Sequence, residues 1–200
     1  MDTNERIIKR AGELFSQYGI QSVRTDDISN ELGISKKTFY KYFVSKEELV
    51  ICVTHRLLES GRTRLEKSII TCDNSIMQAQ AIWETLHTFC MTNNPNFMMD
   101  VQKYYHRAWD MIENFKLEFL GHILTYNLKK GIEQKLYRSD MNANIMSNLW
   151  LDLCQLSYMQ TQSGAEIIAH FIRGLLTVEG LENYSIYFAD FQLTRSKALN

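Results

Sequence analysis

The sequence predicts an all-α protein with a three-helix helix-turn-helix domain at its N-terminus and a larger helical bundle after it. Three observations support this fold class. Apolar residues recur at helical spacing through most of the chain. The 200 residues include a single proline, Pro95, so long helices can run without interruption. Two short amphipathic segments flank a glycine within residues 25–46. We therefore predict domains at residues 1–46 and 47–200.

The glycine between the two short segments is Gly33, and it predicts a helix-turn-helix. Thr25 is expected to cap the first short helix by accepting from backbone N–H groups, and Ser35 the second. Gly33 can adopt the left-handed conformation that ends a helix. Phe39 and Phe43 lie four residues apart, so they would form the inner face of the second helix.

Charge is distributed unevenly along a chain whose net charge is −1. Residues 1–46 carry eight Lys/Arg and six Asp/Glu, whereas the remainder carries fourteen and seventeen. Within residues 35–46 there are four lysines and no acid. A small cationic helix on an otherwise acidic chain favours orientation on DNA by electrostatic attraction.

The N-terminal segment contains an ordered set of motifs. They are Leu14-Phe15 with Gly19, Leu32-Gly33-Ile34-Ser35, Thr38-Phe39-Tyr40, and Phe43 with Lys46-Glu47 and Leu49. With these motifs, residues 7–50 resemble the DNA-binding domain of the tetracycline-repressor (TetR) family. The resemblance covers about the first quarter of the chain, and the remainder resembles the family only in length and helical character.

The resemblance implies a homodimer that binds a near-palindromic double-stranded DNA operator. It implies DNA contacts by Thr25, Ser35, Lys36, Lys37, Thr38, Tyr40, Lys41, Tyr42 and Lys46. Many family members have glycine where this chain has Lys37, and lysine there would project a charge instead of allowing close backbone approach.

Apolar periodicity predicts further helices beyond the motif region. Their ranges are 3–18, 46–70, 75–92, 95–108, 109–131, 143–160 and 164–183. The helix at 46–70 would connect the two domains, so that movement of its far end tilts the DNA-reading helix. Capping boxes are predicted at residues 45–48 and 163–166. Residues 137–140 are expected to form a loop, and periodicity is lost over 184–200.

The resemblance also implies a small-molecule effector site in the C-terminal domain. Aromatic, methionine and polar residues of its central helices are the candidates for lining it. They are Trp83, His87, Met98, Gln102, Tyr105, Trp109, Phe119 and His122. The alternative is that these side chains form an ordinary core.

The last two helices, 143–160 and 164–183, are predicted to pair with their copies as a four-helix dimer interface. The alternative is that their apolar stripes only close the monomer core. Cys52-x-x-His55 and His87-x-x-Cys90 each supply two metal ligands where a closed zinc site needs about four. We therefore expect no metal site, no cofactor and no catalytic set.

Taken together, these patterns predict a regulator of transcription, and we expect a repressor released by a small, largely apolar effector. The chain has no secretory signal and no apolar run of membrane-spanning length, so a cytoplasmic location without a membrane partner is expected. One alternative is a DNA-binding regulator with no small-molecule effector, controlled by a protein partner. Another is a helical enzyme with an incidental helix-turn-helix, which the lack of a catalytic set disfavours.

Overall fold

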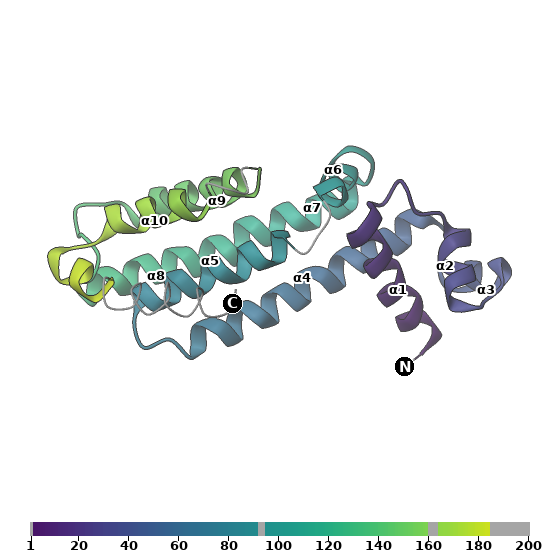
Figure 1. The fold of residues 1–200 in the computed structure, drawn as a ribbon, viewed down its shortest axis with the longest axis horizontal. Helices are drawn as coiled ribbons and strands as arrows, with labels where there is room; N and C mark the ends of the chain where they lie inside the picture. Colours follow the sequence, from purple (N-terminus) through teal and green to yellow (C-terminus); the bar gives the residue numbers. More distant parts are fainter. Residues whose placement is uncertain (1, 92–94, 160–163, 185–200) are drawn as a thin grey trace, which may run out of the picture. The chain divides into compact units, whose positions relative to one another are not determined.

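The computed structural model describes residues 2–91, 95–159 and 164–184, and these residues are mostly helical (Figure 1). Within these ranges, β-type pairing is limited to one isolated antiparallel bridge between Tyr137 and Leu176. The predicted all-α class is confirmed. Among the described residues, no helix combines the length and apolarity needed to cross a membrane.

The chain forms two compact units. Unit 1 comprises Met1–Thr63 and Thr88–Lys116, and unit 2 comprises Arg64–His87 and Leu117–Asn200. One continuous helix, α4, contributes residues to both units. The expected functional division after residue 46 stays a prediction.

Unit 1 combines the helix-turn-helix with two later helices. Its elements are α1 (Thr3–Tyr18), α2 (Thr25–Leu32), α3 (Lys36–Tyr42), the first part of α4 (Lys46–Ile70), α6 (Pro95–Tyr104) and α7 (His106–Asn114). A single apolar core joins these helices, and its buried members include Ile7, Phe15, Ile20, Phe39, Phe43, Phe97, Val101 and Ala108. The helices α6 and α7 therefore pack with the helix-turn-helix.

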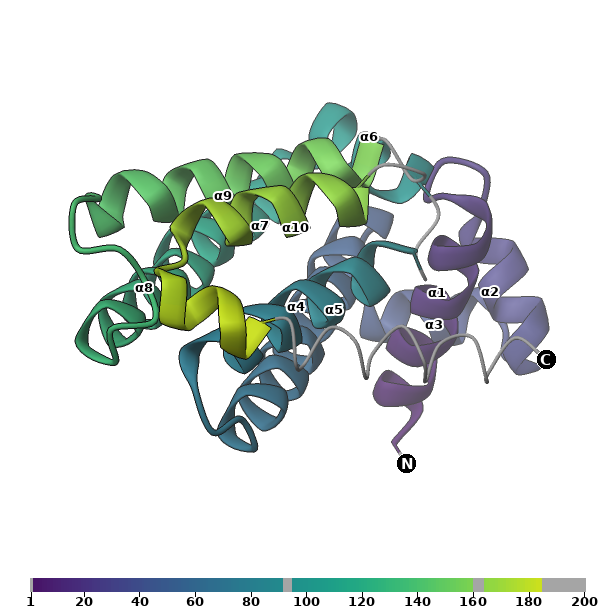
Figure 2. The same ribbon diagram turned by 60° about the vertical axis from the view of Figure 1, so that its left-hand side comes forward.

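Unit 2 contains the later helices of the chain. Its elements are the end of α4, most of α5 (Ser75–Met91), most of the π-helix η1 (Phe115–Leu120), α8 (Gly121–Glu133), α9 (Ala143–Met159) and α10 (Gly164–Leu175). In Figure 2, α9 and α10 run side by side, and both the contacts and Figure 1 agree with this. The core of unit 2 surrounds Trp150, which is buried.

The cap of α2 differs from its prediction by one residue. The helix begins at Thr25, so Arg24 occupies the capping position and the prediction of Thr25 as the cap was wrong. The Arg24 backbone N–H donates to Asp27 Oδ2 at 2.7 Å. The side chain of Asp27, the third residue of the helix, thus fixes Arg24 at the capping position.

The turn between α2 and α3 follows the sequence prediction. Gly33 has φ 64° and ψ 30°, which is the left-handed conformation. The N–H of Ile34 donates to the Ser29 carbonyl oxygen at 3.0 Å, as in a Schellman ending. Ser35 Oγ accepts from the Thr38 N–H at 3.0 Å, so the predicted cap of α3 is confirmed.

The predicted capping box before α4 forms with one change. The Glu48 N–H donates to Ser45 Oγ at 3.1 Å, as expected. The Glu48 carboxylate accepts from the Val44 N–H at 2.7 Å, one residue earlier than a regular capping box requires. The box predicted at 163–166 begins at Ser163, which lies outside the described residues.

Helix boundaries agree with the sequence prediction for α1 and α4, and differ in the middle of the chain. The predicted break between Ala108 and Trp109 was wrong, because α6 ends at Tyr104 and α7 begins at His106. Tyr105, at the break, has φ −131° and ψ 66°, and its side chain is buried in unit 1. The helix thus breaks at a tyrosine that is buried in the tertiary structure. Apolar periodicity in the sequence does not reveal such a break.

The last predicted helix was too long, because α10 ends at Leu175 and not near residue 183. The Thr177 N–H donates to the Leu136 carbonyl oxygen at 3.0 Å, and the Arg138 N–H donates to the Leu175 carbonyl oxygen at 2.8 Å. These bonds draw the chain away from the helix axis. A separate helical segment follows at residues 178–184.

Candidate nucleic-acid interface

The buried face of α3 determines which side chains the helix presents to solvent. Phe39 and Phe43 are buried in the core of unit 1, with ring centroids 5.9 Å apart. The predicted inner aromatic stripe is therefore present. Because α3 has only seven residues, this anchoring leaves its opposite face outward.

The outward face of α3 is cationic and aromatic. Lys36, Lys37 and Lys41 are exposed, and the two tyrosines Tyr40 and Tyr42 are 43% and 37% exposed. Positive charge and ring faces are thus available together on one short helix. Such a surface can contact DNA phosphates, sugars and base edges.

The two hydroxyl residues at the start of α3 are engaged with each other. Ser35 is exposed and Thr38 is half-buried. Their side-chain oxygens lie 2.8 Å apart, and Ser35 Oγ also accepts from the Thr38 backbone. In this structure both residues therefore serve the helix cap, and their predicted contacts with DNA stay a prediction.

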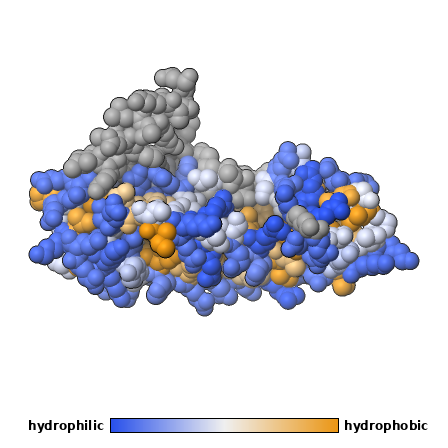
Figure 3. Space-filling model, turned by 90° about the horizontal axis from the view of Figure 1, so that it is seen from below, coloured by the Kyte–Doolittle hydropathy of each residue, from blue (hydrophilic) through white to orange (hydrophobic). Residues whose placement is uncertain are grey.

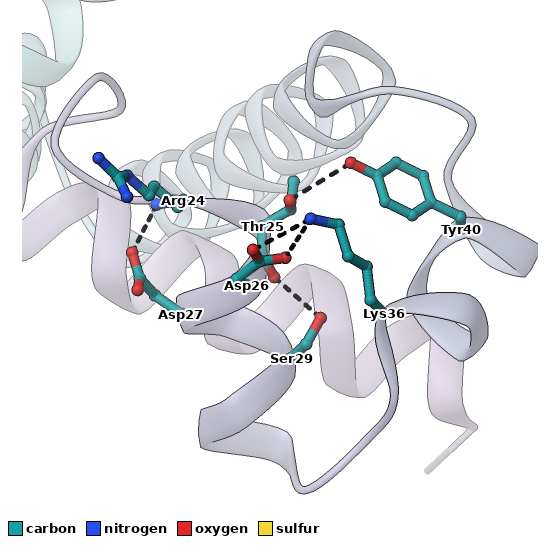
Figure 4. A network of polar contacts seen from close by, with 7 residues as sticks. All are labelled: Arg24, Thr25, Asp26, Asp27, Ser29, Lys36 and Tyr40. Carbon is teal, nitrogen blue, oxygen red and sulfur yellow. Dashed lines mark hydrogen bonds and ion pairs between the residues drawn. The ribbon is translucent and has the colours of Figure 1, made fainter.

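A polar network connects the start of α2 to α3 (Figure 4). Thr25 Oγ1 lies 3.4 Å from the Tyr40 hydroxyl, and Ser29 Oγ donates to the Thr25 carbonyl oxygen at 2.8 Å. Lys36 Nζ lies 2.9 Å from Asp26 Oδ1, and the hydrogen bond to Asp26 raises the pKa of the lysine. The network sets the orientation of one helix against the other.

Lys46 is held differently from the other predicted DNA contacts. Its ammonium donates to the Ile20 carbonyl oxygen at 2.7 Å and lies 6.0 Å from the centroid of the Phe15 ring. Partial burial lowers the pKa of Lys46. In this structure Lys46 holds the segment between α1 and α2, and its contact with a phosphate stays a prediction.

The segment between α1 and α2 is also held by α6 and by the start of α7. The Gln21 N–H donates to Asp100 Oδ2 at 2.9 Å, and Gln21 Nε2 donates to the Tyr105 hydroxyl at 3.2 Å. Sequence analysis missed Gln21 and Asp100. No local pattern signals this pairing, because the partners are 79 and 84 residues apart along the chain.

Comparison with known sequences places the helix-turn-helix in a family. The family model described as "Bacterial regulatory proteins, tetR family" matches residues 7–53, which include most of α1, all of α2 and α3, and the start of α4. The chain is 24% identical over 155 residues to the Transposon Tn10 TetC protein of Escherichia coli, covering 76% of this chain and 78% of that protein. It is 22% identical over 182 residues to an uncharacterised HTH-type transcriptional regulator of Haemophilus influenzae, covering 91% of each.

Two solved structures share this arrangement of helices. A TetR transcriptional regulator from Chloroflexus aurantiacus matches with a TM-score of 0.73 at 17% identity, covering 86% of this chain and 92% of that one. Reduced NemR of E. coli matches with a TM-score of 0.71 at 16% identity, covering 88% and 98%. The chain carries the TetR-family DNA-binding domain over residues 7–53 and shares the fold of solved TetR-family regulators. It is a DNA-binding transcriptional regulator and not an enzyme.

The candidate effector residues divide between the two units of the chain. Met98, Gln102, Tyr105 and Trp109 belong to unit 1. Met98 and Trp109 pack against the core of that unit, Tyr105 is buried within it, and Gln102 is exposed. In unit 1, three of the four predicted residues thus contribute to the apolar core.

The other four candidates, Trp83, His87, Phe119 and His122, belong to unit 2. The Trp83 and His87 rings are in contact, with centroids 5.1 Å apart and planes inclined by 44°. Trp83 and Phe119 pack against the core of unit 2, and His122 is exposed. Their function in effector binding stays a prediction.

Possible metal ligands do not cluster in the described part of the chain, where no three His, Cys, Asp or Glu residues come together around one point. Burial raises the pKa of both the Cys52 and the Cys72 thiols. These cysteines are therefore poorly disposed to act as thiolate ligands or nucleophiles at neutral pH.

Proposed function

We propose that this protein is a cytoplasmic repressor that binds a near-palindromic operator as a homodimer and is released by a small, largely apolar effector. The observation that carries the proposal is the exposed cationic and aromatic face of α3, whose inner face is anchored by Phe39 and Phe43. In helix-turn-helix proteins, the second helix of the motif enters the major groove.

Individual contacts follow from the chemistry of the exposed side chains. Lys41 can donate to a guanine edge or to a phosphate, and Tyr40 and Tyr42 can donate to phosphates and lay their rings against sugars. Thr25 is suited to a backbone phosphate. At the position of Lys37, glycine would allow the backbone to approach DNA closely, whereas lysine presents a positive charge to it.

The outer face of α9 supports dimerisation. Ile145, Leu149 and Leu156 are 60%, 42% and 43% exposed, and their spacing of four and seven residues places them along one side of the helix. Hydrophilic residues cover most of the face shown in Figure 3, where hydrophobic residues form separate patches. These exposed aliphatic side chains, which have exposed Asp152 between Leu149 and Leu156, fit burial against a second copy about a two-fold axis, as in a four-helix bundle.

The outer face of α10 also suits such an interface. Gly174 is exposed, and a Cβ atom placed there would have no neighbour within 4 Å. A glycine on an outward helix face allows another helix to approach closely. Dimerisation also serves recognition, because two half-sites about 34–36 Å apart discriminate better than one short helix can.

Release by an effector requires that a change in the C-terminal domain reach α3. Two features support such coupling. The helix α4 is continuous from Lys46 to Ile70 and contributes to both units. In addition, α6 and the start of α7 hold Gln21 through Asp100 and Tyr105. We propose that an effector shifts the population between two separations of the paired α3 helices.

The test is operator binding by the full-length protein over a series of salt concentrations, with its own upstream DNA as the probe. Lys41→Ala and Tyr42→Ala should each weaken specific binding about tenfold, since each removes a contact to the duplex. Lys67→Ala, which removes an exposed lysine near the end of α4, is the matched control and should change little. Equal affinity of the α3 variants and the parent would contradict the proposal.

A further inference from the structure

The ion pair between Asp26 and Lys36 lies within the candidate interface. Lys36 Nζ is 2.9 Å from Asp26 Oδ1 and 3.0 Å from Asp26 Oδ2, so both carboxylate oxygens are within hydrogen-bond distance of it. The two side chains remain 60% and 51% exposed. Figure 4 shows them reaching toward each other from the starts of α3 and α2.

The neighbouring acid, Asp27, has a different function. Its carboxylate accepts from the Arg24 backbone N–H and so caps α2. Asp26 instead directs its carboxylate to the first lysine of the reading helix. An acid in this position places a negative charge where DNA phosphates would approach. It therefore opposes the sequence-independent attraction of the α3 lysines.

An exposed ion pair is weak enough to open when a better partner arrives. A DNA phosphate competes with Asp26 for the same ammonium group. Opening the pair leaves a carboxylate facing the duplex, where phosphates repel it. The exocyclic amino groups of cytosine and adenine in the major groove can instead donate to it. The Asp26–Lys36 ion pair therefore opens at the lowest cost on DNA sequences that place a cytosine or adenine amino group beside Asp26.

We propose that Asp26 is a specificity-determining residue, which competes with DNA phosphates for Lys36 and so weakens binding to arbitrary sequences. This inference rests on the proposed DNA-binding function of α3. Non-specific affinity comes almost entirely from phosphate contacts, whereas specific affinity also draws on base contacts. Occupying one lysine therefore raises the ratio of specific to non-specific affinity.

The test measures binding of the full-length protein to a fluorescent duplex of random sequence over a salt series. Asp26→Asn keeps the shape of the side chain and removes its charge. The variant should bind this duplex about two- to fivefold more tightly at low salt. Its plot of log affinity against log salt should be steeper by about one, because Lys36 now neutralises one more phosphate.

A double-mutant cycle separates the ion pair from a general change in net charge. Lys36→Ala in the parent should weaken non-specific binding less than it does in the Asp26→Asn background, because it breaks no phosphate contact and only leaves the Asp26 carboxylate unpaired. Lys36→Ala in the Asp26→Asn background should remove the whole gain. Glu5→Gln, at another exposed acid of unit 1, is the control for net charge and should leave the salt slope unchanged.

The possible outcomes discriminate clearly. If the parent binds DNA and Asp26→Asn binds random sequence no more tightly, this inference is overturned while the proposed function stands. The same conclusion follows if Glu5→Gln produces an equal gain and an equal change in slope. If the parent binds neither its upstream region nor random duplex, the proposed function fails and this inference fails with it. A thermal unfolding curve for each variant verifies that it is folded.

Discussion

Units 1 and 2 place their polar interactions differently. In unit 1 the ion pairs of Arg10 with Glu13 and Glu31, and of Lys36 with Asp26, are open to solvent. In unit 2 a polar cluster around Ser75, Asn127 and Tyr137 is buried. Exposed pairs contribute little to stability and can exchange partners, whereas buried polar groups must keep theirs.

The buried cluster joins the start of α5 to the end of α8. The Tyr137 hydroxyl lies 2.9 Å from the Ser75 carbonyl oxygen and 3.1 Å from Asn127 Oδ1. Asn127 Nδ2 donates to the same carbonyl oxygen at 2.9 Å. The Ser75 N–H and hydroxyl both donate to Gln134 Oε1, at 3.0 and 2.7 Å. Losing one member would leave a buried polar group with one hydrogen bond fewer, at a place where burial keeps water from replacing it.

The outer surfaces of the two units also differ in polarity. The outward face of α3 in unit 1 carries three exposed lysines, and that of α9 in unit 2 carries three exposed aliphatic residues. Both helices rest on an apolar core, so the core does not determine what each one binds. The comparison fits our proposals that unit 1 exchanges polar partners with DNA and that unit 2 buries apolar surface against a second copy.

The largest effect is expected from a charge in the aliphatic stripe of α9. Leu149→Glu should convert the protein to a monomer by sedimentation, because a carboxylate would be buried at the centre of the interface. Operator affinity should then fall about 100-fold or more, since only one half-site is engaged at a time. Ile70→Glu, at an exposed aliphatic residue at the end of α4, is the control and should remain dimeric. If the Leu149→Glu variant remained dimeric, the assignment of α9 to the dimer interface would be wrong.

The next effect compares one glycine from each unit. A Cβ atom at Gly180 would clash with the carbonyl oxygen of Leu136, so Gly180→Ala should destabilise unit 2 by about 3 kcal/mol. Gly33 has open space and a left-handed backbone, so Gly33→Ala should cost only about 1 kcal/mol. Urea unfolding of the two variants measures the difference. Equal costs would mean that the 178–184 segment moves freely to accommodate a methyl group.

A smaller loss is expected from the buried cluster. Tyr137→Phe removes the shared hydroxyl proton and should cost about 1–2 kcal/mol at neutral pH. Burial raises the pKa of Tyr137 above its ordinary value. The unfolded chain therefore loses this proton first, and the parent should lose stability as the pH rises above about 10. Urea midpoints on both sides of that pH should show a shallower alkaline loss for Tyr137→Phe, and equal slopes would contradict this.

The smallest effect belongs to the exposed contact of α6 in unit 1. Asp100→Ala removes the acceptor for the Gln21 N–H and should lower stability by about 0.5–1 kcal/mol, because water can replace the lost partner. Asp110→Ala, at an exposed acid of α7, serves as the matched control. Thermal unfolding measures both. A loss as large as that of Tyr137→Phe would remove the distinction between the two units.

Much of the helix-turn-helix could be predicted from sequence, because its signals are local. The turn at Gly33, the cap at Ser35 and the inner stripe of Phe39 and Phe43 each depend on residues within four positions. The predicted cap of α2 was one residue too late, because the Asp27 carboxylate accepts a hydrogen bond from the backbone of Arg24. The exposed face of α3 followed from its buried face.

By itself, the sequence determined the helical class, the bounds of α1 and α4 and the outward chemistry of α3, since periodicity and capping act within one or two helical turns. Only the tertiary structure decided the break at Tyr105, the end of α10 at Leu175 and the contact of Lys46 with the Ile20 carbonyl oxygen. In each case the partner lies at least 26 residues away along the chain. Folding brings these groups together, so no local pattern records them.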